Sequence, residues 1–169
     1  MRILGVDPGL AKVGWGVIEQ PTDKSPEQRK KEEWLVVEYG CISTSAKKSI
    51  AERLSKINQA ITKLISQFEP TEAAIENLFF GVNAKTAMKV GEGKGVVILA
   101  CGQCNIPVKE FTPLEIKTAL TGYGRADKKQ VQEMVKRFLN LEQLPQPDHA
   151  ADALACAYCA GITRGQPEL

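Results

Sequence analysis

Apolar residues between positions 50 and 68 recur at intervals of three and four, the spacing that places side chains on one face of a helix. They are Ile50, Leu54, Ile57, Ile61, Leu64, Ile65 and Phe68. This predicted helix follows three strand-like segments and precedes an alternation of strands and helices. The order of the elements therefore predicts a mixed α/β sheet.

Three strand-like segments open the chain. Residues 3–6 form a short apolar run that stops at the Asp-Pro-Gly sequence of residues 7–9, where Pro and Gly favour a turn, and residues 13–18 resume the apolar pattern. Residues 34–39 are rich in strand-favouring types. We expect these segments to form a three-strand meander with Asp7 at the end of its first strand.

Two further strands and a helix are expected after the helix at residues 50–68. The Ala-Ala-Ile sequence of residues 73–75 predicts a buried strand that ends at Glu76, and residues 106–108 predict a fifth strand. Between these strands, Asn83 can cap a helix that continues to about Cys101.

Three capping signals mark the helices of the last third of the chain. Thr112 begins a capping box, Asp127 precedes a second apolar helix face, and Asp148 follows Pro147 at the start of the last helix. The sequence thus predicts a five-stranded mixed sheet flanked by helices. We expect one domain over residues 1–169, in which residues 164–169 are a frayed tail.

The composition limits the compartment and the partners. No apolar run approaches the roughly 20 residues of a membrane helix, and the first residues lack the apolar stretch of a signal peptide. We therefore expect a cytoplasmic protein with no membrane partner. The formal net charge of +2 is too small to indicate nucleic acid by itself, although residues 109–137 carry a mild basic excess.

The cysteines form two CxxC pairs, Cys101 with Cys104 and Cys156 with Cys159. Zinc ribbons place such pairs in tight knuckles about 15–20 residues apart. These pairs are much farther apart, in apolar segments that read as helical. Buried free thiols are therefore expected in preference to a structural zinc site.

Acidic residues at three distant places suggest a reactive site. Glu76 ends a strand that should be buried, where an unpaired carboxylate costs several kcal/mol, so we expect a cation beside it. His149 and Asp152 are three residues apart and share one face of the last helix. Asp7 could equally be the cap of an Asx turn, and the pair at positions 149 and 152 could simply favour a helix N-terminus.

Carboxylates of this kind are hard oxygen ligands, which suit Mg²⁺ or Mn²⁺ better than zinc. Two such ions about 3.5–4 Å apart can activate water and stabilise the leaving oxygen in a phosphoryl displacement. This chemistry needs several carboxylates that meet in one cleft.

Four segments in order, residues 3–9, residues 74–76 with Phe79 after them, residues 83–95 and residues 148–154, together resemble the RuvC family of Holliday junction resolvases. The match covers nearly the whole chain. The resemblance implies a ribonuclease H-like fold and a homodimer that nicks four-way DNA junctions symmetrically with Mg²⁺ or Mn²⁺. The family's branch-migration proteins, RuvA and RuvB, are implied as partners.

The resemblance also assigns site residues. It implies that Asp7, Glu76 and Asp152 are metal ligands and catalytic residues, with two ions in the site. His149 stands where some members have Asp, so this site departs from an all-carboxylate set. A neutral imidazole can ligate Mn²⁺, or it can hold the attacking water as a base.

DNA contacts are implied at three further positions. Phe79 aligns with an aromatic residue that the family uses against bases near the junction centre, although a place in the core is the competing interpretation. Lys117 and Lys128 align with basic residues that contact phosphate near the scissile bond. The helix from Asn83 carries a small-residue stripe that could serve either a dimer interface or packing on the sheet, made of Ala87, Met88, Gly91 and Gly95.

Two other functions are compatible with parts of the pattern. An actin-like or sugar-kinase-like ATPase also has an acidic residue in a Gly-containing turn, but it needs a second Asp-Gly phosphate loop, which does not appear after Glu76. A module that binds branched DNA without cutting it would not be expected to collect Asp7, Glu76 and Asp152 beside phosphates.

Overall fold

The computed structural model describes residues 1–21, 33–77 and 84–163. These parts of the chain form a five-stranded sheet in the order β3-β2-β1-β4-β5. The strands are β1 (Arg2–Asp7), β2 (Lys12–Glu19), β3 (Leu35–Ser43), β4 (Glu72–Glu76) and β5 (Val108–Phe111). The first three form the predicted antiparallel meander, whereas β4 runs parallel to β1 and β5 runs parallel to β4. The predicted mixed sheet is therefore confirmed.

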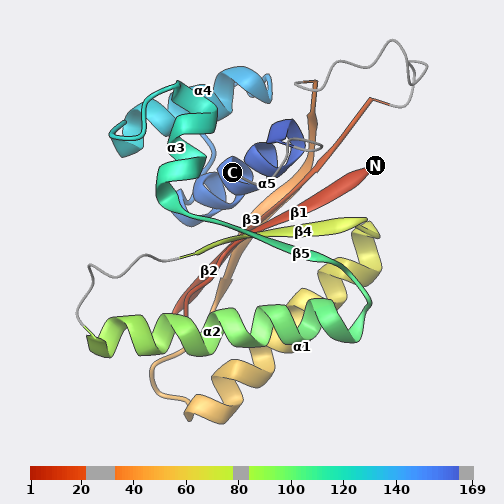
Figure 1. Cartoon of the computed structure of the whole chain (residues 1–169). Coiled ribbons are helices and arrows are strands. Elements are labelled where there is room, and N and C mark those ends of the chain that lie inside the picture. The colour runs from red at the N-terminus through yellow and green to blue at the C-terminus, as the bar shows by residue number, and fades with distance from the viewer. Residues whose placement is uncertain (22–32, 78–83, 164–169) are drawn as a thin grey trace.

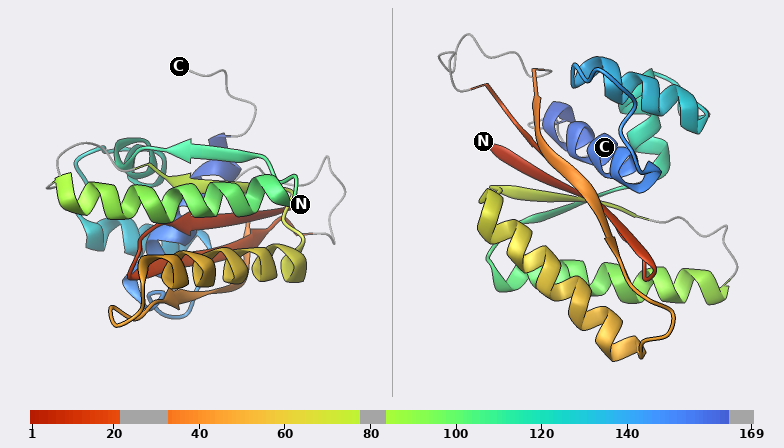
Figure 2. Two further views of the ribbon diagram at one scale, coloured as in Figure 1. Left: turned by 90° about the horizontal axis from the view of Figure 1, so that it is seen from below. Right: turned by 180° about the vertical axis from the view of Figure 1, so that it is seen from behind.

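Helices cover both faces of the sheet (Figures 1 and 2). On one face lie α1 (Ile50–Phe68) and α2 (Ala84–Gln103). On the other lie α3 (Pro113–Thr121), α4 (Lys128–Phe138) and α5 (Asp148–Thr163). Of the helices that the structure describes, none is both long and apolar enough to cross a membrane.

Alternating residues of β1 face two separate hydrophobic cores, as the pleat of a strand requires. Leu4 and Val6 are fully buried against α1 and α2, whereas Ile3 is fully buried in the core that contains α5. Asp7 is two residues beyond Gly5 and four beyond Ile3, so its side chain points toward the face that α5 covers. The strand pattern thereby sets the direction of the first acidic side chain.

Three glycines let α5 lie directly on the sheet. A Cβ atom on Gly14 would stand 1.8 Å from the carbonyl oxygen of His149, and one on Gly5 would stand 2.0 Å from that of Ala153. At Gly16 the added atom would meet the Leu154 side chain at 2.6 Å. A side chain at Gly5 or Gly14 would collide with a backbone carbonyl, so the absence of one lets the backbone of α5 approach β1 and β2 closely.

The edge strands differ from their predicted bounds. The third strand extends from the predicted end at Tyr39 to Ser43, because β3 pairs with β2 as far as Lys12. The fifth begins at Val108 rather than Ile106, since Pro107 has no N–H to donate and the paired residues are the more polar ones that follow. An edge strand has one open side, so polar residues continue it without an apolar signal.

The capping predictions have mixed outcomes. Thr112 and Asp127 each cap a helix in a reciprocal capping box, as predicted. Asp148 was expected to be an N-cap but is instead the first residue of α5, so that prediction is wrong by one position. The predicted cap at Asn83 and the predicted frayed tail at residues 164–169 lie outside the described residues.

One of the two uses expected for the small-residue stripe of α2 is excluded. Cβ atoms on Gly91 and Gly95 would meet nothing within 4 Å, and Met88 is 70% exposed. This face of α2 therefore does not pack on the sheet within the described chain. Gly93 lies on the opposite side of the helix, where an added Cβ would stand 2.7 Å from the carbonyl oxygen of Gly9.

Candidate active site

Two of the predicted site residues end neighbouring parallel strands. Asp7 is the last residue of β1 and Glu76 is the last residue of β4. The two strands are paired with Val6 opposite Ile75. The next residue of each strand therefore brings both carboxylates to the carboxyl ends of the two strands, side by side. Parallel pairing thus juxtaposes acidic groups that are far apart in the sequence.

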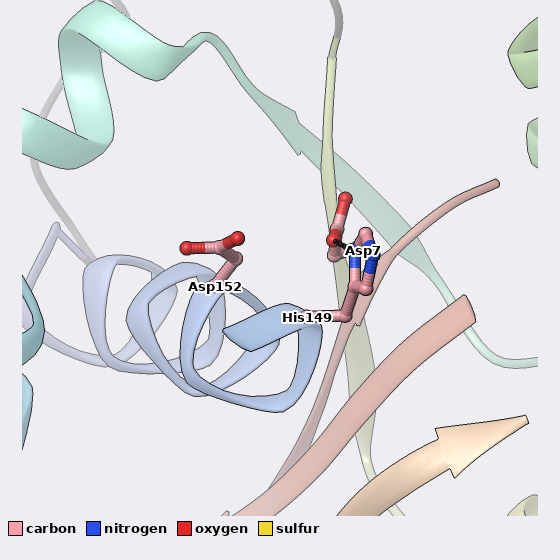
Figure 3. Close-up of side chains that lie close together, drawn as sticks. All are labelled: Asp7, His149 and Asp152. Atoms are coloured by element: carbon pink, nitrogen blue, oxygen red, sulfur yellow. Dashed lines mark hydrogen bonds and ion pairs between the residues drawn. The ribbon is translucent and has the colours of Figure 1, made fainter. Parts of the chain in front are cut away.

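The first turn and a half of α5 adds the other two predicted residues. His149 Nδ1 lies 2.7 Å from Asp7 Oδ2, in hydrogen-bond contact. One ligand atom from each of Asp7, His149 and Asp152 falls within 4.8 Å of the other two, and Figure 3 shows these side chains projecting from β1 and α5 toward one another. The close contact of α5 with Gly14 is what allows them to meet.

Asp7 and Glu76 hold their protons more tightly than ordinary carboxyl groups. Burial, together with the nearby charges of Asp7 and Asp152, raises the pKa of Glu76 to about 7. Burial also raises the pKa of Asp7, although its hydrogen bond with His149 opposes the shift. Without a further cation, the site therefore carries repulsion between like charges.

Two lysines partly offset this repulsion. Lys117 and Lys128 line a pocket of about 290 Å³ together with Glu76 and Asp152, and both lower the pKa of Glu76. Lys128 Nζ lies 2.9 Å from Asp152 Oδ2 and 3.4 Å from Asp148 Oδ2. Burial lowers the pKa of Lys128, but its contacts with these two carboxylates outweigh burial and raise it. The cation expected beside Glu76 is present, yet it does not fully compensate the charge.

Asp148 was predicted to cap α5, but its carboxylate instead contacts side chains of α4. Its carboxylate accepts a hydrogen bond from Gln132 of α4 at 3.3 Å, and it also lies near Lys128. The hydrogen bond from Gln132 and the charge of Lys128 lower the pKa of Asp148. Asp148 therefore ties the start of α5 to α4 and holds Lys128 at the border of the cluster.

The donor set fits a divalent cation of the hard type. Asp7, His149 and Asp152 offer carboxylate oxygens and one imidazole within 4.8 Å of one another, distances that a single ion can span, whereas Glu76 stands outside that group. Burial is the largest cause of the raised pKa values of Asp7 and Glu76. By contrast, all five cysteines are free thiols, and the metal-site geometry found within the described residues does not include them.

Three residues that bear on the site were either not described by the structure or not predicted from the sequence. Phe79 lies outside the described residues, so its expected contact with bases has no structural counterpart here. The role of Gly14 under His149 was not anticipated, because a glycine in a strand gives no sign of what approaches it. Lys94, which contacts the residue after Glu76, was also missed, since only the fold brings it there.

Known proteins resemble this chain over most of its length. Residues 3–160 match the family model described as crossover junction endodeoxyribonuclease RuvC. A protein of that name from Finegoldia magna is 46% identical over 159 residues, covering 94% of this chain and 92% of its own.

Solved structures agree with this match. The structure of Thermus thermophilus RuvC in complex with a Holliday junction substrate is 31% identical, with a TM-score of 0.87 over 96% of this chain and 93% of that one. The yeast mitochondrial Holliday junction resolvase Ydc2 shares the fold at 12% identity, with a TM-score of 0.62 over 95% of this chain and 78% of its own. The sheet and its helices form the expected ribonuclease H-like fold, and the chain belongs to the family of crossover junction endodeoxyribonucleases known as RuvC.

Proposed function

We propose that this protein resolves four-way DNA junctions by hydrolysing phosphodiester bonds in two strands symmetrically, with divalent cations held by Asp7, Glu76, His149 and Asp152. The observation that carries this proposal is the convergence of Asp7, His149 and Asp152, whose ligand atoms lie within 4.8 Å of one another. The structure of a 31% identical relative with a Holliday junction substrate supports the choice of DNA.

The cations are proposed to be two Mg²⁺ or Mn²⁺ ions in each site. When bound, such ions activate water and stabilise the leaving oxygen of an in-line displacement. Asp7, Glu76 and Asp152 would hold the ions through their carboxylate oxygens. These carboxylates repel one another in the metal-free protein, and relief of that repulsion would favour cation binding.

His149 is proposed to hold the water that attacks the phosphate, or to complete the ligand set. Its Nδ1 atom is engaged by Asp7, and the ring is 41% exposed. A proton on Nδ1 would leave Nε2 as an acceptor that can take a proton from water. Cleavage would leave a 5′-phosphate and a 3′-hydroxyl.

Lys117, Lys128 and Phe79 are proposed to contact the DNA. Both lysines border the pocket beside Glu76, where they can approach the phosphate that the carboxylates would otherwise repel. Phe79 follows Glu76 by three residues and is proposed to stack on bases near the junction centre. A binding module without cleavage is disfavoured, because it would gain nothing from acidic groups gathered beside phosphates.

The proposed assembly is a homodimer that acts in the cytoplasm with the RuvA and RuvB branch-migration proteins. We also propose that residues 1–169 act as one domain. The two-fold symmetry of a junction suits two identical clefts related by a two-fold axis. The unpacked face of α2 around Gly91 and Gly95 is available for that contact.

Asp7→Asn is expected to lower the rate of junction cleavage by at least about 10³-fold while junction binding survives, because the amide cannot bridge two cations. Cleavage would be measured under single-turnover conditions with four-way and linear duplex DNA, each with Mg²⁺, Mn²⁺ or a chelator. Binding would be measured in the chelator at several salt concentrations, since counterion release should weaken it as salt rises. Near wild-type cleavage by the variant would remove Asp7 from the mechanism.

A further inference from the structure

Lys94 of α2 contacts residues beside the end of β4. Its Nζ atom donates hydrogen bonds to Asn77 Oδ1 at 2.9 Å and to Glu110 Oε2 at 2.6 Å. The Lys94 side chain is 19% exposed, so this contact is more sheltered than an ordinary surface ion pair. We refer to Lys94, Asn77 and Glu110 as the α2 clamp.

Asn77 connects the α2 clamp to the candidate active site. It follows Glu76 directly, and its backbone N–H donates to the carbonyl oxygen of Phe111 at 2.8 Å. The backbone of Asn77 is thus held by β5, while its side chain is held by α2. These two bonds fix the chain at the residue after Glu76, which sets the direction in which the Glu76 side chain leaves the strand.

The neighbouring residue of α2 touches the turn after the other strand carboxylate. A Cβ on Gly93 would stand 2.7 Å from the carbonyl oxygen of Gly9, which is two residues beyond Asp7. Consecutive residues of α2, Gly93 and Lys94, therefore contact the chain just beyond Asp7 and just beyond Glu76. The helix is placed to hold the two strand ends at a fixed separation.

We propose that Lys94 is a positioning residue that, through Asn77, keeps the Glu76 carboxylate directed at the cation site. The charges of Asp7 and Asp152 repel a charged Glu76, and the α2 clamp would oppose displacement of its carboxylate. The Lys94 ammonium group is engaged by Asn77 and Glu110 and is not among the proposed cation ligands. This inference rests on the proposed role of Glu76 as a ligand. Partners that orient ligands in this way commonly change metal affinity or activity by about 10–100-fold.

The competing explanation is that Lys94 and Glu110 form a simple ion pair that anchors α2 to β5. The two explanations differ in their dependence on Asn77. Asn77→Ala removes the bond to the β4 exit and keeps the ion pair, whereas Glu110→Gln removes the charge of the pair and keeps the bond to Asn77. Lys94→Met removes both contacts.

The test measures Mn²⁺ binding to the DNA-free, full-length variants by titration calorimetry, and single-turnover junction cleavage at saturating enzyme. Lys94→Met and Asn77→Ala are each expected to weaken Mn²⁺ binding and slow cleavage by about 10-fold or more, with junction affinity in chelator unchanged. Glu110→Gln should stay within about fivefold of wild type in both measurements. Raising the Mn²⁺ concentration should restore part of the lost rate.

Lys48→Met is the matched control, because it removes an exposed ion pair with Glu52 on α1, and it should match wild type in both measurements. Thermal melting of each variant fixes an assay temperature at which all are folded. Wild-type behaviour of Asn77→Ala would overturn the inference and favour the ion pair that anchors α2 to β5. Equal losses in Lys94→Met and Glu110→Gln, with none in Asn77→Ala, would do the same. Glu76→Gln separates the two levels: if it binds Mn²⁺ and cleaves like wild type, the proposed function of Glu76 itself fails.

Discussion

Glu76 occupies a position where the fold disfavours its charge. It ends a strand whose other residues are buried, and Asp7 and Asp152 lie close enough to raise its pKa to about 7. A carboxylate in this setting keeps its proton to a higher pH than an ordinary glutamate does, and a bound cation would favour its release. We therefore expect cation binding to strengthen as pH rises through about 7, because proton and cation compete for the same oxygens.

The raised pKa of Glu76 also predicts how stability varies with pH in the metal-free protein. Between the ordinary pKa of 4.5 and about 7, the folded state binds this proton more tightly than the unfolded state does. The stabilisation from Glu76 is thus complete below the ordinary value and is lost as pH rises through about 7. Glu76→Gln stays neutral throughout, so at pH 8 it should exceed wild type in unfolding free energy by on the order of 1–3 kcal/mol.

Urea unfolding in a chelator at pH 5 and at pH 8 would check this expectation. The advantage of Glu76→Gln should be large at pH 8 and small at pH 5, and adding Mn²⁺ at pH 8 should stabilise wild type more than the variant. A variant less stable than wild type at pH 8 would mean that Glu76 is compensated in the folded protein.

Lys128 competes with any cation for the Asp152 carboxylate, because its Nζ lies 2.9 Å from Oδ2. We expect Lys128→Met to bind Mn²⁺ at least as tightly as wild type, yet to cleave junctions roughly 10²-fold more slowly through loss of a phosphate contact. Calorimetry without DNA and single-turnover cleavage would separate the two effects. Weaker Mn²⁺ binding by the variant would show that Lys128 supports the ligand set instead of competing with the cation.

At the scale of elements, the contact between α5 and the sheet determines whether the cluster forms. Gly14 meets the backbone of α5 at His149, the residue whose ring contacts Asp7. A methyl group at position 14 would displace the first turn of the helix, because the atom it meets is a backbone carbonyl that cannot rotate away. The separation of β1 from α5 is therefore set by backbone contact.

Gly14→Ala should lower the unfolding free energy by about 1–3 kcal/mol and abolish most cleavage, because the overpacked helix start must shift. Gly102→Ala is the matched control, since an added Cβ there meets nothing within 4 Å and alanine is favoured in a helix. Chemical denaturation and a cleavage assay would compare the pair. Wild-type cleavage by Gly14→Ala would show that the site tolerates a displaced helix.

The elements differ in how well the sequence predicts them. The apolar face of α1 and the caps at Thr112 and Asp127 depend on local periodicity and local hydrogen bonds, so both were predicted correctly. The ends of β3 and β5 depend on pairing with a neighbouring strand, which local composition does not record. The meeting of Asp7, His149 and Asp152 could be expected from their types and from the family resemblance, but their distances follow from glycine contacts visible only in the fold.

At the scale of the whole molecule, α2 is placed between the site and a surface that nothing covers within the described chain. One side of the helix carries Gly93 and Lys94, which touch the strand ends, and the other carries Gly91 and Gly95. Met88 and Leu99 add exposed apolar groups at 70% and 54%. If the proposed dimer uses this side, only α2 would separate each subunit's strand ends from the partner subunit.

Met88→Glu is expected to shift the protein from dimer to monomer in sedimentation at micromolar concentration, because two copies of the new charge would face each other across a two-fold axis. Leu114→Glu is the matched control: Leu114 is 61% exposed on α3, on the opposite side of the sheet (Figure 1). A dimeric Met88→Glu protein would place the interface elsewhere. A wild-type protein that is monomeric at this concentration would contradict the dimer itself.

The contact of α5 with Gly5 and Gly14 separates two properties of a metal site, the spacing of its scaffold and the identity of its ligands. Main chain rests on main chain, so the spacing of the scaffold does not depend on which ligands project from it. Exchanging His149 for another ligand type should therefore retune ion selectivity without rebuilding the frame, which makes position 149 the natural starting point for redesign.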